Sequence, residues 1–161
     1  MYPSSSKDLN KETEKVVYFF TPAFHLLDNF SAHVIHIWDV DFPTAEHAFH
    51  WKKFSISHPE IAAEILASRS PHSAQKIAHA NIEKVDPSWY DKRVGVMEEI
   101  LIAKAGQHED VGDALKKTEN REIIENSPVD DFWGCGPDGS GRNEVGKIWM
   151  KIRVNIKKVA D

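Results

Sequence analysis

The sequence has little cysteine, no excess of basic residues and no long apolar run. Among its 161 residues there is one cysteine, Cys135, which excludes an intramolecular disulfide and a cluster of cysteine ligands. The formal net charge of -5 predicts no broad basic surface for the phosphate backbone of a nucleic acid. No window approaches the roughly 18 apolar residues of a membrane span. A soluble protein that holds a small anionic ligand through a few local cations is compatible with all three absences.

No charged-then-apolar leader is recognisable either, so we expect a cytoplasmic protein. With 41% hydrophobic and 28% charged residues, the chain is of single-domain size and can bury a core. Residues 1–15, MYPSSSKDLNKETEK, are polar with a run of serines and are expected to be a flexible tail. The folded domain is then expected over residues 16–160. The sequence sets no expectation for the oligomeric state.

Apolar periodicity predicts strands at the start of the chain and helices after it. Val16–Phe20 and His33–Trp38 are rich in β-branched and aromatic residues and are expected to be strands, with a short return strand after the second. From Thr44 onward the helical period dominates. The expected helices are 44–54, 59–67, 71–80, 87–105 with Gly106 as a stop, 110–117 and 143–159. We therefore expect strands only in the first quarter of the chain.

The helix predicted at Pro43–Phe54, PTAEHAFHWKKF, carries an unusual polar stripe. Glu46, His50 and Lys53 fall within one narrow stripe, whereas most of the remaining circumference is apolar. A helix of this kind is expected to be buried, so its charged stripe has to face polar partners or a water-filled cleft. On the helix alone, an ordinary solvated face with side-chain pairing stays open as the alternative.

A second unusual stretch is Ser127–Arg142, SPVDDFWGCGPDGSGR, with four glycines and two prolines in sixteen residues. Adjacent large aromatics, Phe132 and Trp133, need burial or a stacking partner, which indicates a structured ligand loop. The loop leads into a helix near Asn143, whose free backbone N–H groups, with Lys147 in the first turn, are candidates for holding a phosphate. The alternative is that the glycines only form a tight turn.

Three other chemistries are disfavoured. Residues 134–139 match G-x-G-x-x-G, but the buried strand and the βαβ context of a dinucleotide fold are missing. His47 and His50 occur as E-H-x-x-H, which is not a zinc-protease order, so we expect no metal and no cofactor. Cys135 has no histidine that the sequence ties to it and is not expected to be a nucleophile.

The carboxylates are the stronger candidates. Cleavage of a glycosidic bond needs an acid or base beside an oxocarbenium-like centre, a role open to Glu46, with Asp130 as a second carboxylate. Trp89 or Trp133 is suited to stacking on a base, although a tryptophan is more often part of the core.

Taken in order, these motifs resemble the NADAR family of YbiA-like N-glycosidases. They are T-x-E-H-x-F in the polar helix, D-x-x-W-G-x-G-x-D-G-x-G-x-N from Asp130 to Asn143, and V-G-K-x-x-M-x-x-R up to Arg153. Asp28-Asn29-Phe30 is similar to an early S-N-F element of the family. The resemblance runs from about Tyr18 to Arg153. It implies an α+β fold, a mostly helical single domain with a small N-terminal β-sheet.

The resemblance also implies hydrolysis of an N-glycosidic bond to ribose, with a phosphorylated ribosylamino-pyrimidine of riboflavin synthesis as the substrate. By position, Glu46 corresponds to the catalytic acid/base and Asp130 to the second acid. The implied substrate-binding residues are Asn29, Phe30, His50, Lys53, Trp89, Trp133, Gly134, Asn143 and Lys147. The alternatives are an ADP-ribosyl hydrolase acting on a modified nucleobase or NAD-like substrate, and a module that binds NAD or ADP-ribose without turnover.

The chain departs from the family pattern at three places. His50 stands where the family usually has Gln, residues 77–79 lack a common Arg, and Glu119 replaces a glycine. These positions touch expected substrate contacts, so the resemblance supports the reaction better than the substrate.

Overall fold

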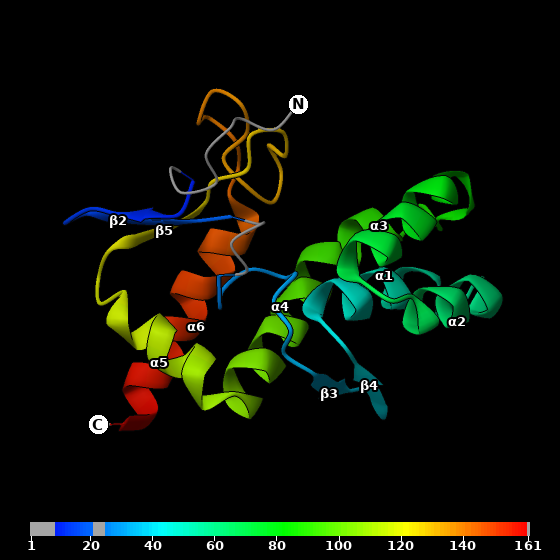
Figure 1. Ribbon diagram of the computed structural model, residues 1–161, viewed down its shortest axis with the longest axis horizontal. Helices are drawn as coiled ribbons and strands as arrows, with labels where there is room; N and C mark the ends of the chain where they lie inside the picture. Colours follow the sequence, from blue (N-terminus) through cyan, green and yellow to red (C-terminus); the bar gives the residue numbers. More distant parts are fainter. Residues whose placement is uncertain (1–8, 21–24, 161) are drawn as a thin grey trace. The chain divides into compact units, whose positions relative to one another are not determined.

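The computed structural model describes residues 9–20 and 25–160 of the chain, which folds as two units (Figure 1). Unit 1 comprises Met1–Asp28 and Glu109–Asp161, and unit 2 comprises Asn29–His108. Unit 1 is therefore formed by two segments of the chain, and unit 2 is formed by the continuous segment between them. None of the helices in the described ranges combines the length and the apolarity that crossing a membrane requires.

Unit 1 contains a three-stranded sheet in the order β1-β2-β5, in which β1 is antiparallel and β5 parallel to β2. Its elements are β1 (Lys11–Glu12), β2 (Val16–Phe19), α5 (Glu109–Lys117), β5 (Glu122–Glu125) and α6 (Glu144–Ala160). Val17 and Phe19 of β2 and Ile123 of β5 are buried, since alternate residues of a strand share one face. Helix α6 packs against β5 and against α5, so these apolar residues belong to the core of the unit.

β5 corrects the expectation that strands occur only in the first quarter of the chain. Its four residues are too few to display a period of two, and the strand forms because it pairs with β2, where Val16 lies opposite Glu122. The small sheet is thus completed by a strand from the C-terminal part. β2 confirms the strand predicted at Val16–Phe20. β1 lies within the stretch expected to be a tail, whereas residues 1–8 lie outside the described residues.

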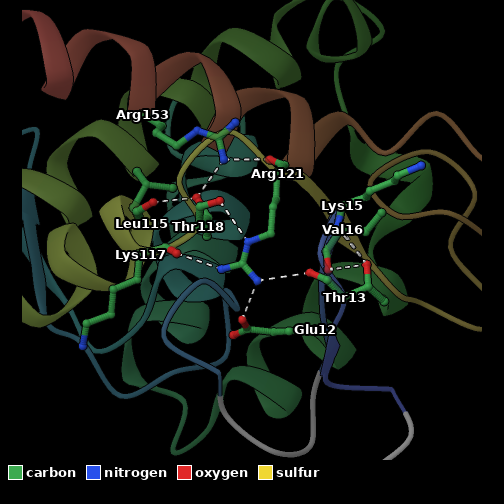
Figure 2. A network of polar contacts seen from close by, with 9 residues as sticks. All are labelled: Glu12, Thr13, Lys15, Val16, Leu115, Lys117, Thr118, Arg121 and Arg153. Atoms are coloured by element: carbon green, nitrogen blue, oxygen red, sulfur yellow. Dashed lines mark hydrogen bonds and ion pairs between the residues drawn. The ribbon is translucent and has the colours of Figure 1, made fainter.

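Two arginines connect β1, the end of α5 and α6 within unit 1 (Figure 2). Arg121 Nη1 donates to Glu12 Oε2 at 2.7 Å. Its Nη2 and Nε donate to the carbonyls of Lys117 and Thr118. Arg153 on α6 donates to Thr118 Oγ1 and to the carbonyl of Arg121. Carbonyls at the C-terminal end of α5, which lack partners inside the helix, are therefore satisfied by side chains.

Unit 2 is helical with a single two-stranded hairpin among its described residues. Its elements are β3 (Ile35–Ile37), β4 (Val40–Phe42), α1 (Ala45–Phe54), α2 (Pro59–Ala67), α3 (Pro71–Ala80), the 3-10 helix η1 (Ile82–Lys84) and α4 (Trp89–Gln107). α1 packs against α2, α3 and α4 (Figure 1). A helix with three helical neighbours has most of its surface buried, as the composition of α1 predicts.

Local sequence signals set the starts of these helices. Thr44 Oγ1 accepts the backbone N–H of His47 at the start of α1, and Ser70 caps α3 in the same way. Pro59 and Pro71 occupy the first positions of α2 and α3, where the missing N–H costs nothing. The helices predicted from these signals are confirmed.

Two expectations for unit 2 need correction. The strand predicted at His33–Trp38 comprises only Ile35–Ile37, and it ends there because Trp38 takes a positive φ of 54° and belongs to the turn into β4. Gly106 does not end α4, which continues to Gln107. The Gln107 side chain accepts the N–H of His36 at 2.8 Å and donates to its carbonyl at 2.7 Å, so a contact with the hairpin stabilises the last turn.

Candidate active site

Glu46 and His50 of the charged stripe of α1 are buried inside unit 2, and Lys53 is half-buried. Glu46 lies in the first turn and is 7% exposed, and its Oε1 is 2.8 Å from Nε2 of His50. From α3, Nε2 of Gln75 lies 3.5 Å from the same oxygen. The backbone N–H of Glu46 donates to the carbonyl of Asn29 at 3.2 Å. The alternative of an ordinary solvated face is therefore wrong, because the stripe meets side chains of other elements away from solvent.

His50 stands at the middle of the stripe and is 4% exposed. Its Nδ1 lies 3.3 Å from Nζ of Lys53, and its ring meets the ring of His79 edge-on, with the centroids 6.2 Å apart. An ammonium group has only donors, so Nδ1 accepts from Lys53. The proton of the neutral imidazole is then on Nε2, which donates to Glu46 Oε1.

The three groups shift one another's pKa values. Burial alone would raise the pKa of Glu46, but His50, Lys53 and His79 outweigh it and hold that pKa below its ordinary value. Burial lowers the pKa of His50, against the opposing effect of Glu46. Burial also lowers the pKa of Lys53 to about 8. At neutral pH the stripe therefore holds a carboxylate, a neutral imidazole and an ammonium.

An aromatic pair borders the cation of this stripe. The rings of Phe49 and Trp89 are 5.2 Å apart between centroids, and Nζ of Lys53 lies 5.3 Å and 5.9 Å from the two centroids. At these distances the ammonium is attracted by the faces of the rings. Trp89 is 6% exposed, so it packs largely inside the unit. Its expected stacking on a base stays a prediction.

Asn29 brings an unpaired acceptor to the same region. The residue is 7% exposed, and its Nδ2 lies 3.5 Å from Sδ of Met97. Its Oδ1 is buried without a hydrogen-bond partner among the described residues. A buried acceptor without a partner is costly, and a ligand hydroxyl or amine that donates to it would remove the cost. Phe30, the next residue, is half-buried.

His47, the other histidine of the E-H-x-x-H motif, has a structural role. Its Nδ1 lies 2.8 Å from Thr44 Oγ1, and its Nε2 lies 3.2 Å from the carbonyl of Ser68. Both ring nitrogens are thus engaged in holding the start of α1 to the end of α2. The ring contributes no free nitrogen beside His50.

Unit 1 contains the glycine-rich loop. Asp130 Oδ1 accepts the backbone N–H groups of Phe132 and Trp133 at 2.9 Å and 2.7 Å, and its own N–H donates to Ser127 Oγ. Asp130 therefore shapes a tight Asx turn. Trp133 is half-buried, with its ring edge-on to Phe132 at 4.8 Å between centroids. The expected role of Asp130 as the second acid stays a prediction.

The start of α6 does not offer the free N–H groups that the sequence led us to expect. The N–H groups of Asn143, Glu144 and Val145 donate to the carbonyls of Gly134, Phe132 and Trp133. The loop folds back and caps the helix with its own backbone, which leaves no cradle of these three donors for a phosphate. Lys147 is exposed, and its Nζ lies 3.3 Å from Oε1 of Glu144. Its expected phosphate contact stays a prediction.

Asn143 joins α6 to β5 through its side chain. Its Oδ1 accepts the N–H of Glu125 at 2.9 Å, and its Nδ2 donates to the carbonyl of Ile123 at 2.8 Å. The residue has a positive φ of 51°, which asparagine tolerates better than most residues. Two glycines are required for the same packing. A Cβ at Gly134 would lie 2.7 Å from the carbonyl oxygen of Glu125, and a Cβ at Gly146 would lie 2.1 Å from that of Ile123. Sequence reasoning missed this role, and the expected ribose or phosphate contact of Asn143 stays a prediction.

The predicted site residues thus fall into two groups. Unit 2 brings together Asn29, Glu46, His50, Lys53 and Trp89, and unit 1 contains Asp130, Trp133, Gly134, Asn143 and Lys147. Gln75 was not predicted, because nothing in its local sequence distinguishes it from other polar residues of a helix. Cys135 is buried, which raises the pKa of its thiol and disfavours a nucleophilic thiolate.

Comparison with known proteins agrees with the resemblance in the motifs. The sequence profile of the NADAR domain matches residues 10–157. An N-glycosidase of Nostoc punctiforme is 31% identical over 146 residues, which cover 89% of this chain and 94% of that protein. A riboflavin biosynthesis protein of Vibrio vulnificus is 31% identical over 149 residues, which cover 91% of this chain but 40% of that longer protein.

The fold is similar to the NMR structure of YbiA from Escherichia coli, with a TM-score of 0.79 and 25% sequence identity. The superposition covers 96% of this chain and 94% of that chain. The mostly helical fold with small sheets that the resemblance implied is confirmed.

Proposed function

This chain belongs to the NADAR family and is by homology an N-glycosidase of the YbiA type, and we propose that its substrate is a phosphorylated ribosylamine. The C1'-N bond would be that of a ribosylamino-pyrimidine phosphate of the kind found in riboflavin synthesis. The name of the Vibrio vulnificus relative supports this substrate class. The observation that carries the proposed chemistry is the buried carboxylate of Glu46, ionised and hydrogen-bonded to a neutral His50.

A C1'-N bond breaks through an oxocarbenium-like state that a nearby carboxylate stabilises. In the proposed reaction Glu46 first takes up a proton and then gives it to the departing nitrogen, which leaves with the bonding electron pair. The resulting carboxylate then accepts a proton from the water that adds to C1'. The products are the free base or amine and ribose 5-phosphate, and the proton balance closes on Glu46.

The surroundings of Glu46 supply complementary contacts. Phe49 and Trp89 offer apolar ring surface to the base, and Lys53 offers positive charge for the phosphate or for the ionised Glu46. The unpaired Oδ1 of Asn29 is available to accept from a ribose hydroxyl.

The roles proposed in unit 1 come from the family resemblance. Asp130 would act as the second acid through the oxygen that does not hold the Asx turn, and Trp133 and Gly134 would shape the part of the loop that contacts the sugar. Lys147 is an exposed cation suited to a phosphate. Asn143 would contribute by holding the loop on β5.

The test is a comparison of three substrates under identical conditions. The full chain is incubated with a ribosylamino-pyrimidine phosphate, with NAD and with ADP-ribosylated guanine, and ribose 5-phosphate, nicotinamide and guanine are measured as products. We expect turnover to be fastest with the ribosylamino-pyrimidine phosphate. Faster release of nicotinamide or guanine would show that the preferred substrate is an ADP-ribosyl compound instead. Saturable binding of all three without any released base would make the chain a binding module and overturn the proposal.

A further inference from the structure

Glu46, His50 and Lys53 form a continuous hydrogen-bonded line along α1. The distances are 2.8 Å from Glu46 Oε1 to His50 Nε2 and 3.3 Å from His50 Nδ1 to Lys53 Nζ. The carboxylate and the imidazole are buried, whereas the amine is half-buried. The line therefore leads from a partly solvated cation to a carboxylate that is shielded from solvent.

The hydrogen-bond roles along this line are determined by the chemistry of its ends. The ammonium of Lys53 has no acceptor, and an ionised Glu46 has no donor. His50 must therefore accept on Nδ1 and donate from Nε2. The opposite tautomer would place two lone pairs against each other at the carboxylate and two donors against each other at the amine.

We propose that Lys53 and His50 form a proton relay that supplies Glu46 with the proton it gives to the departing nitrogen. Lys53 Nζ transfers a proton to His50 Nδ1 while His50 Nε2 transfers its proton to Glu46 Oε1. The products of the transfer are a neutral amine, a neutral imidazole protonated on Nδ1 and a neutral carboxylic acid, so charge and protons balance. The reverse transfer restores the resting state after the added water has returned a proton to Glu46.

This relay rests on the proposed function. In that reaction Glu46 has to donate a proton, although its carboxylate is ionised in the resting protein. His50 and Lys53 act through Glu46 and are positioning residues in this scheme. The other charged or titratable groups that face them are His79 on α3 and Arg93 on α4. Arg93 lowers the pKa of Lys53, which favours loss of a proton from Lys53, whereas His79 lowers the pKa of Glu46 and so returns the line to its ionised resting state after the reaction.

The pH dependence follows from the resting state. The relay can start only from a protonated Lys53, whose pKa burial lowers to about 8. We therefore expect turnover by the wild-type chain to fall as the pH rises through about 8. A His50→Gln variant keeps a donor for Glu46 and an acceptor for Lys53 but cannot pass a proton between them.

The experiment compares pH-rate profiles of the wild-type chain, His50→Gln and Lys53→Met, with Lys52→Met as the matched control. Lys52 lies on the same helix with its ammonium over Trp38. We expect His50→Gln to lose about tenfold or more in kcat at pH 7, with KM within about threefold, and to lose the decline near pH 8. Lys53→Met should lose kcat and the decline near pH 8 in the same way, with a higher KM where Lys53 also contacts the phosphate, and Lys52→Met should retain the wild-type profile. A wild-type kcat and an unchanged decline in His50→Gln would overturn the relay.

A second measurement does not depend on turnover. The ¹⁵N resonances of His50 in the free protein report which ring nitrogen carries the proton. We expect the Nε2-H tautomer at pH 7, and an Nδ1-H tautomer would refute the relay. Absence of base release from every substrate by the wild-type chain would instead refute the proposed function, so the two failures are distinguishable.

Discussion

The backbone N–H of Glu46 donates to the carbonyl of Asn29 at 3.2 Å, which holds the first turn of α1 to the residue that carries an unpaired buried acceptor. The main-chain contact holds the backbone of Asn29 beside the first turn of α1. Asn29 and Glu46 are therefore neighbours within unit 2.

The first prediction concerns this acceptor. Asn29→Ala removes Oδ1, which has no partner among the described residues, and the weak contact of Nδ2 with Met97 Sδ, so the melting temperature should change little while KM rises about tenfold, or about 1.4 kcal/mol. Asn81→Ala is the matched control, because Asn81 Nδ2 donates to the carbonyl of Ile77 at 2.9 Å. That variant should lose about 1 kcal/mol of unfolding free energy and keep its KM. The reverse pattern would make Asn29 a structural residue.

The second prediction concerns Glu46. Glu46→Gln keeps an acceptor for His50 but cannot carry the proton, so turnover should fall by about 10³-fold while ligand affinity stays within about threefold. Single-turnover rates and isothermal titration measure the two quantities. Glu64→Gln, at an exposed position of α2, serves as the control and should behave as wild type. A near-normal rate in Glu46→Gln would remove Glu46 from the chemistry.

The third prediction separates two roles of Asp130. Asp130→Asn retains an oxygen that can accept from Phe132 and Trp133, whereas Asp130→Ala retains none. The proposed role as the second acid predicts that Asp130→Asn loses about tenfold or more in kcat and keeps its melting temperature. Asp130→Ala should lose stability as well. Wild-type kcat in Asp130→Asn would show that the residue only shapes the loop.

The fourth prediction concerns Asn143. Asn143→Ala removes two hydrogen bonds to β5 and puts a residue with a Cβ but without a polar side chain at a positive φ of 51°. We expect a loss of about 2–4 kcal/mol in unfolding free energy, measured by urea denaturation. Asn143→Gly tolerates the φ angle and should lose less. Unchanged stability with a raised KM would instead support a direct substrate contact.

The fifth prediction compares two glycines. A Cβ at Gly146 would lie 2.1 Å from the carbonyl of Ile123, so Gly146→Ala should destabilise the protein by about 3 kcal/mol or more. Gly95 lies on an exposed part of α4, where an added Cβ would meet nothing within 4 Å. Gly95→Ala should stabilise by about 0.5–1 kcal/mol through helix propensity. Thermal unfolding of both variants is the measurement, and equal effects would contradict the packing of α6 on β5.

The helices and the polar stripe were predictable because their signals are local. Thr44 and Ser70 act as caps within three residues of their partners, and the spacing of Glu46, His50 and Lys53 is set by the period of one helix. The family motifs add to this, since they extend through the loop from Asp130 to Asn143 and agree with the profile match.

The remaining features depend on residues far apart in the sequence. β5 exists because Glu122 pairs with Val16, and α4 passes Gly106 because Gln107 binds the backbone of His36. No local pattern contains either partner, so no local rule could predict these contacts.

The sequence by itself determined which charged groups share a face of α1, since the geometry of one helix is enough to place them together. Only the tertiary structure decided their protonation, because burial by neighbouring helices lowers the pKa of Lys53 and of His50 while the charges around Glu46 hold it ionised. The tertiary structure also decided that the first N–H groups of α6 donate to carbonyls of the glycine-rich loop. These hydrogen bonds depend on how that loop folds back on β5.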